Sequence, residues 1–221
     1  MILLFDKKRL LLYLCTDRAL AMGRPLAALV EAAVAGGVTM VQLREKGLNT
    51  RDFLEEARAM RALTKRLGVP LVINDRVDIA LAAGADGVHL GGNDLPVEAA
   101  RALAGGRLFI GATARSVEAA RAAKEAGADY LGVGAMFPTG TKSDTVTIGP
   151  ATLRAIKEAT GMPTVGIGGV NARNAALVTA AGADGVAVVS AILSKPDAEA
   201  AARAIRKAAE GAIRPARDNP E

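Results

Sequence analysis

The stretch LVINDRVDIALAAGADGVHLGGNDLP, residues 71–96, contains the pattern that decides the fold. An apolar run at 71–73 predicts a strand, a short helical run follows, and a second apolar run at 87–90 predicts another strand. Parallel neighbouring strands need such a helical crossover. Asp75 and Asp94 follow the two strands, so we expect them side by side at the carboxyl edge of one sheet. Two converging carboxylates favour a hard divalent cation held by oxygen ligands.

The same unit repeats along the chain. Gly-Ala-Asp turns at 84–87, 127–130 and 182–185 stand between helical and apolar segments, where glycine can end a helix. Strands are expected at 11–14, 38–43, 71–73, 87–90, 109–112, 130–133, 163–167 and 185–189. Their alternation with helices predicts an α/β fold, a single-domain (β/α)8 TIM barrel over residues 1–213 with a frayed tail at 214–221. A doubly wound open sheet is the alternative, because periodicity cannot show closure.

Composition restricts the class of protein. The chain has 221 residues, 51% hydrophobic and 23% charged, which suits one globular domain. Its single cysteine, Cys15, excludes an internal disulfide framework and favours a cytoplasmic protein. The charged residues at 6–9 interrupt the apolar start, so neither a membrane span nor a signal peptide is expected. The net charge of +5 fits a small anionic substrate or a solvated surface, whereas 3% aromatic residues offer few stacking platforms for nucleic acid.

Reactive groups of such barrels gather on the loops that follow the strands. The aspartates of the Gly-Ala-Asp turns lie at the opposite end, so Asp86, Asp129 and Asp184 are expected to be structural. The residues after the strands are rich in basic and amide groups and include two acids. They are Gln42, Arg44, Lys46, Asn74, Asp75, Asp94, Thr113, Thr139, Thr141, Lys142, Gly168, Gly169 and Ser190. This set favours a phosphate ligand together with a metal ion.

Three segments carry this interpretation, and each has a simpler alternative. At 42–46, QLREK alternates, so Gln42, Arg44 and Lys46 could clamp a diphosphate, or the segment could be a surface strip of ion pairs. GIGG at 166–169 and VSAI at 189–192 could bind phosphate through backbone N–H groups, or glycine could only relieve crowding. PTGTK at 138–142 lies in a long loop that could close over a ligand or be a plain solvent loop.

Two further residues are expected to be structural. His89, the single histidine, lies within a predicted strand, so we expect it to be packed and hydrogen-bonded rather than a catalytic base. Cys15 is expected to be a buried, inert thiol.

The motifs together resemble the thiamine-phosphate synthase family. They are QLREK at 42–46, INDR at 73–76, GADGVHLG at 84–91, PTGTK at 138–142, GIGG at 166–169 and VSAI at 189–192. The resemblance implies a transferase that joins an aminopyrimidine methyl diphosphate to a thiazole phosphate, or to its 2-carboxy form. The products would be thiamine phosphate and pyrophosphate, and Mg²⁺ would be the cofactor. Pyrophosphate would depart before the thiazole nitrogen attacks, so no protein nucleophile is needed.

The resemblance also assigns roles to individual residues. The pyrimidine diphosphate would be held by Gln42, Arg44, Lys46, Asn74, Thr113 and Lys142, with Leu43 and Glu45 counted in the same binding segment. Asp75 and Asp94 would bind Mg²⁺. The thiazole phosphate would be held by Thr139, Gly140, Thr141, Gly169, Val189 and Ser190. Arg44, Lys46 and Lys142 are the predicted catalytic residues, because their charges can neutralise departing pyrophosphate.

Two alternative functions stay open. The related thiazole tautomerase uses a histidine after the fifth strand, where this chain has Thr113-Ala114-Arg115. A non-catalytic phosphate-binding barrel would bind ligand without turnover. Small molecules are the expected partners, and the sequence leaves the oligomeric state open, a homo-oligomer included.

Overall fold

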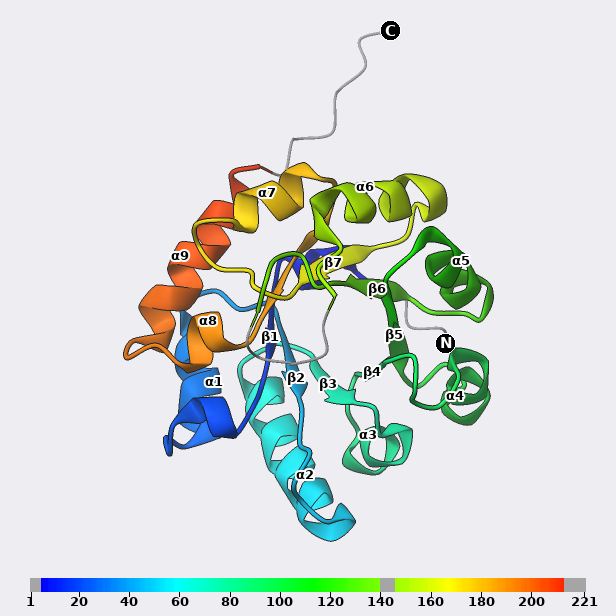
Figure 1. Ribbon diagram of the computed structural model, residues 1–221. Coiled ribbons are helices and arrows are strands. Elements are labelled where there is room, and N and C mark those ends of the chain that lie inside the picture. The colour runs from blue at the N-terminus through cyan, green and yellow to red at the C-terminus, as the bar shows by residue number, and fades with distance from the viewer. Residues whose placement is uncertain (1–4, 140–145, 213–221) are drawn as a thin grey trace, which may run out of the picture.

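The computed structural model describes residues 5–139 and 146–212, and their strands form a closed barrel (Figure 1). The strands are β1 (Leu12–Cys15), β2 (Met40–Leu43), β3 (Leu71–Asn74), β4 (Gly87–Leu90), β5 (Phe109–Ala114), β6 (Tyr130–Val133), β7 (Thr164–Ile167) and β8 (Gly185–Val188). Each is parallel to the next, and β1 also pairs with β8, where Leu12 lies opposite Val186. This last pairing closes the sheet, so it confirms the (β/α)8 barrel and excludes the open sheet. The predicted strand ends lie within two residues of the observed ones.

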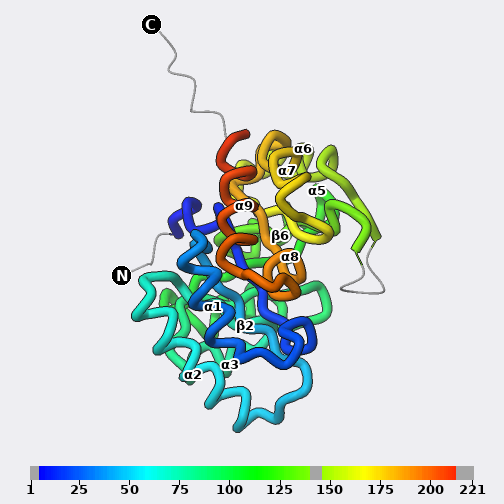
Figure 2. Tube along the Cα trace, turned by 90° about the vertical axis from the view of Figure 1, so that its left-hand side faces the viewer, coloured from blue at the N-terminus to red at the C-terminus, as the bar shows by residue number. Residues whose placement is uncertain are grey.

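A ring of helices surrounds the strands in Figure 1. The ring consists of α1 (Leu26–Ala35), α2 (Thr50–Arg66), α3 (Val77–Ala83), α4 (Val97–Ala104), α5 (Val117–Glu125), α6 (Gly149–Thr160), α7 (Ala175–Ala180) and α9 (Ala198–Glu210). Of the short helices, η1 (Lys7–Leu10) precedes β1, η2 (Ala19–Ala21) lies between β1 and α1, and α8 (Ser190–Leu193) lies between β8 and α9. The first and last long helices, α1 and α9, pack together, so the ring of helices also closes (Figures 1 and 2). Among the described residues, no helix has the length and apolar character that a bilayer crossing requires.

The apolar residues form two concentric layers because strand side chains alternate in direction. An outer core between strands and helices includes Leu14, Val41 and Leu43. An inner core fills the barrel and includes Tyr13 and Cys15. Cys15 is therefore buried, as expected.

The Gly-Ala-Asp turns hold the amino-terminal ends of neighbouring strands together. Each aspartate accepts hydrogen bonds, at 2.5–2.8 Å, from a backbone N–H of the neighbouring strand and from a basic side chain. The partners are Leu71 and Arg61 for Asp86, Ile110 and Arg101 for Asp129, and Thr164 and Lys157 for Asp184. Their predicted structural role is confirmed, because each carboxylate joins two strands and a helix.

Candidate active site

A cavity of about 1580 Å³ opens among the loops that follow the strands. Most of the predicted site residues within the described part of the chain line it. They are Gln42, Arg44, Lys46, Asn74, Asp75, Asp94, Thr113, Thr139, Gly169, Val189 and Ser190. Gly140, Thr141 and Lys142 lie outside the described residues. The barrel thus brings together side chains that are far apart in the sequence.

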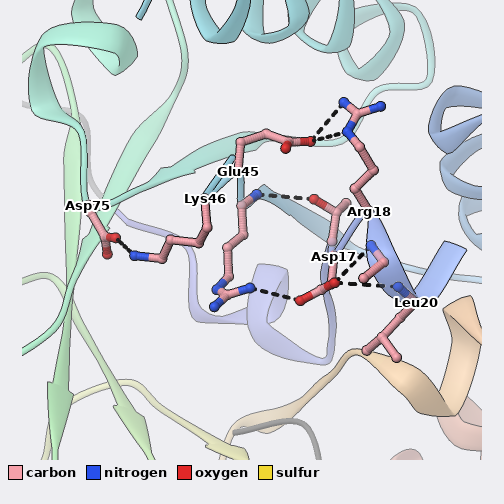
Figure 3. A network of polar contacts seen from close by, with 9 residues as sticks. Asp17, Arg18, Leu20, Glu45, Lys46 and Asp75 are labelled. Carbon is pink, nitrogen blue, oxygen red and sulfur yellow. Dashed lines mark hydrogen bonds and ion pairs between the residues drawn. The ribbon is translucent and has the colours of Figure 1, made fainter. Parts of the chain in front are cut away.

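Two residues of the predicted binding segment do not line this cavity. Leu43 packs in the outer core with no exposed surface. Glu45 accepts a hydrogen bond from Arg18 at 2.8 Å, whereas its neighbour Lys46 extends toward Asp75 (Figure 3). The reason is the alternation along the strand, which directs every second side chain away from the cavity. The side chains of Leu43 and Glu45 therefore lie away from the cavity, and their contact with substrate stays a prediction.

Asp75 and Asp94 lie close together, as the adjacent strands β3 and β4 predict. Asp75 accepts a hydrogen bond from Lys46 Nζ at 2.5 Å, and Asp94 accepts one from the Gly91 N–H at 2.7 Å. Burial opposes ionisation of the Asp75 carboxyl, but hydrogen bonding with Asp94 and Lys46 outweighs it and lowers the pKa of Asp75. Burial and the neighbouring Asp75 carboxylate raise the pKa of Asp94. A cation between the two groups would relieve their repulsion.

This acid pair suits Mg²⁺ better than a metal held entirely by protein. Within residues 5–139 and 146–212, no group of three or more His, Cys, Asp or Glu side chains is placed to hold a metal. Mg²⁺ typically uses one or two carboxylates and takes its other ligands from substrate phosphates and water. Asp75 and Asp94 therefore fit a Mg²⁺ ion that arrives with a diphosphate.

Arg44 meets an acid that sequence reasoning did not assign to the site. Asp17, which follows β1, accepts a hydrogen bond from Arg44 Nη1 at 2.8 Å, and both residues line the cavity. The Arg44 Nε–H is buried and has no hydrogen-bond partner among the described residues. An unpaired buried donor costs about 1–3 kcal/mol. An anion bound beside Arg44 would accept this hydrogen bond and so remove the cost. The position of Asp17 directly after a strand was the signal that could have found it.

The loops after β7 and β8 form the opposite wall. Gly168 and Gly169 have φ of 95° and 67°, and a Cβ on Gly169 would stand 2.7 Å from the Pro138 carbonyl oxygen. Only glycine fits this backbone closely, because the left-handed conformation and the crowding both disfavour a side chain. Val189 and Ser190 lie where β8 passes into α8. These backbone groups and Thr139 face the cavity together.

His89 is packed and hydrogen-bonded, as expected. Its Nδ1 lies 3.0 Å from the Tyr130 hydroxyl, and its Nε2 lies 3.1 Å from the Thr113 hydroxyl. Tyr130 in turn lies 3.0 Å from the Tyr13 hydroxyl. Sequence reasoning missed both tyrosines, because a tyrosine in an apolar strand is usually a packing residue.

Comparison with known proteins supplies the family. The sequence profile of a family described as thiamine monophosphate synthase matches residues 12–192, which is most of the chain. The chain belongs to this family. A protein named thiamine-phosphate synthase from Chloroflexus aurantiacus is 53% identical over 196 residues, covering 88% of this chain and 90% of the relative. One of the same name from Clostridium novyi is 50% identical and covers 88% and 96%.

A solved structure supports the same membership. It is described as thiamine phosphate pyrophosphorylase from Pyrococcus furiosus, and it is 42% identical to this member of the family. The likeness has a TM-score of 0.87 and covers 94% of this chain and 98% of the other. It therefore extends over the whole barrel and not only over the motifs at the strand ends.

Proposed function

We propose that this protein is a Mg²⁺-dependent thiamine-phosphate synthase. The proposal rests on one observation about the cavity. Asp75, Lys46 and Arg44 line one wall, and the opposite wall is made of glycine-rich backbone. Such a cavity suits one ligand with a diphosphate and a second with a single phosphate. Family membership supports the same pair of substrates, an aminopyrimidine methyl diphosphate and a thiazole phosphate.

The diphosphate belongs at the wall formed by β2, β3 and β4. Arg44 offers its buried Nε–H, and Lys46 already lies against a carboxylate that Mg²⁺ would engage. Asp75 and Asp94 would hold the ion, which when bound neutralises charge on the departing pyrophosphate. Lys142 stays a predicted contributor to the same charge balance.

The bond changes need no protein nucleophile. The bond between the pyrimidine methylene carbon and the diphosphate oxygen breaks, and its electron pair leaves with pyrophosphate. The amino group of the pyrimidine stabilises the positive charge on the methylene carbon. The lone pair of the thiazole nitrogen then forms the new C–N bond. The residues of the chain contribute by orienting both ligands, neutralising charge and excluding water.

The thiazole phosphate belongs at the wall formed by the loops after β7 and β8. Gly169, Val189 and Ser190 offer backbone N–H groups, and Thr139 adds a hydroxyl from the loop after β6. Backbone donors bind a phosphate dianion without needing a cationic side chain. A cytoplasmic location stays part of the proposal, because a chain with one cysteine, Cys15, forms no internal disulfide and so suits a reducing compartment.

The decisive test is turnover by the purified protein. Mixed with both substrates and Mg²⁺, it should form thiamine phosphate and pyrophosphate in equal amounts, and a chelator should stop the reaction. Binding of the thiazole phosphate without product would contradict the proposal and favour a binding protein. Conversion of a thiazole isomer without consumption of the diphosphate would favour a tautomerase.

A further inference from the structure

A chain of hydrogen bonds crosses the barrel interior from β2 to β5. Gln42 Nε2 donates to the Tyr13 hydroxyl at 2.7 Å, and the Tyr13 and Tyr130 hydroxyl oxygens are 3.0 Å apart. Tyr130 lies 3.0 Å from His89 Nδ1, and His89 Nε2 lies 3.1 Å from Thr113 Oγ1. Gln42 and Thr113, the two ends, both line the cavity. We name this set the polar relay.

The inner rings of the polar relay are held rigidly. Tyr13 and Tyr130 are 1% and 0% exposed, and the Phe5 ring stacks on Tyr130 with 5.1 Å between centroids. The Tyr130 ring lies over Gly111, where a Cβ would come within 2.1 Å of it. The His89 ring lies over Gly132 in the same way, at 2.8 Å. Because the rings occupy the space that side chains at these glycines would take, they have little room to turn.

The direction of the protons along the polar relay follows from counting donors and acceptors. The pKa of Tyr13 and that of Tyr130 are both raised by burial, so both phenols keep their protons. Tyr13 accepts from Gln42, and its own proton has only the Tyr130 oxygen as a nitrogen or oxygen acceptor among the described residues. Tyr130 must then donate to His89 Nδ1.

The remaining two groups are fixed by the same count. A ring nitrogen that accepts a hydrogen bond carries no proton, so His89, accepting at Nδ1, has its proton at Nε2 and donates to Thr113 Oγ1. The hydroxyl proton of Thr113 is then not used within the relay and can be donated into the cavity. Reversing the direction would leave a buried Tyr13 proton without an oxygen or nitrogen acceptor, which is costly.

We propose that Tyr13, Tyr130 and His89 are positioning residues that hold His89 as the Nε2–H tautomer and thereby make Thr113 a hydrogen-bond donor to a ring nitrogen of the bound aminopyrimidine. The part of this inference that concerns the ligand rests on the proposed function, whereas the tautomer does not. The polar relay spans the barrel interior from β2, which is followed by Arg44 and Lys46, to β5. It therefore links the wall that binds diphosphate to the group that orients the pyrimidine ring.

The tautomer can be measured without any ligand. His89 is the single histidine of the chain, so the ¹⁵N NMR signals of labelled histidine belong to it alone. We expect a protonated Nε2 and an unprotonated Nδ1 in the unliganded wild-type protein at neutral pH. A proton on Nδ1, or on both nitrogens, would overturn the proposal whatever the enzymatic activity is.

A double-mutant cycle tests whether the polar relay acts through Thr113. Tyr130→Phe should raise KM for the pyrimidine diphosphate about tenfold, as expected for one lost hydrogen bond, and leave KM for the thiazole phosphate unchanged. In a Thr113→Val background the same change should have no further effect. Thr113→Ser, which keeps the hydroxyl that Thr113→Val removes, should have a KM for the pyrimidine diphosphate near that of the wild type. Thr179→Val, a buried control in α7, should change neither KM. Additive effects, or equal rises in both KM values, would refute action through Thr113.

Discussion

Replacing Asp75 by asparagine removes one carboxylate of the acid pair and preserves the shape of the side chain. Asparagine is the right substitute because Asp75 has a φ of 63°, in the left-handed region. Asparagine adopts this conformation readily, whereas alanine would add strain of about 1–2 kcal/mol. The ion pair that is lost involves Lys46, whose side chain is 57% exposed, so the fold should lose less than about 1 kcal/mol.

The effect on metal binding should be much larger. When Mg²⁺ is bound to a carboxylate oxygen, the centre of the carboxylate charge lies about 3 Å from the ion. With the dielectric constant of water, about 80, the two charges then attract by about 3 kcal/mol. Loss of that charge corresponds to a roughly hundredfold weaker affinity. Asp75 is partly buried, and a lower local dielectric would make the loss greater.

The measurement is the initial rate against free Mg²⁺ at saturating substrate. Asp75→Asn should raise the half-saturating Mg²⁺ concentration by about a hundredfold, while thermal unfolding stays near that of the wild type. Asp17→Asn is the matched control, because it removes the same charge from the same cavity without touching the acid pair. If both variants shift the Mg²⁺ requirement equally, or if Asp75→Asn shifts it less than about threefold, Asp75 is not a metal ligand.

Three further changes probe other parts of the site. Gly169→Ala should raise KM for the thiazole phosphate at least about tenfold, because the new Cβ crowds the Pro138 carbonyl; an unchanged KM would place the phosphate elsewhere. Arg44→Lys should lower kcat/KM for the diphosphate by about tenfold or more, since lysine lacks the Nε–H and the planar fork; full activity would remove Arg44 from the proposed role. Gly111→Ala should destabilise by about 3 kcal/mol and lower Tm by about 6–12 °C, as calorimetry can check; a wild-type Tm would contradict the packing of Tyr130.

The strand-end residues could be predicted because their position follows from chain order alone. Asp75 and Asp94 each follow an apolar strand, and neighbouring parallel strands present their ends at one edge. Alternation of side-chain direction along a strand predicted that Gln42, Arg44 and Lys46 share a side. It did not identify which partners those side chains would meet, and the pairing of Arg44 with Asp17 depends on how β1 lies against β2.

The polar relay lay beyond sequence reasoning for a different reason. Tyr13 and Tyr130 are 117 residues apart and meet because β1 and β6 face each other across a closed barrel. Periodicity records which side of a strand a residue occupies but carries no information about contacts across the interior. Nor could it show that Gly111 and Gly132 are needed to seat the rings of Tyr130 and His89.

The sequence by itself determined the alternation of strands and helices, the residues at the strand ends and the resemblance to the family, because each depends on local spacing and residue type. Closure of the sheet, the shared electrostatics of Asp75 and Asp94, and the polar relay from Gln42 to Thr113 were decided only by the tertiary structure. The physical reason is that local patterns fix the direction of each side chain, whereas distances between side chains on different strands exist only once the barrel has closed.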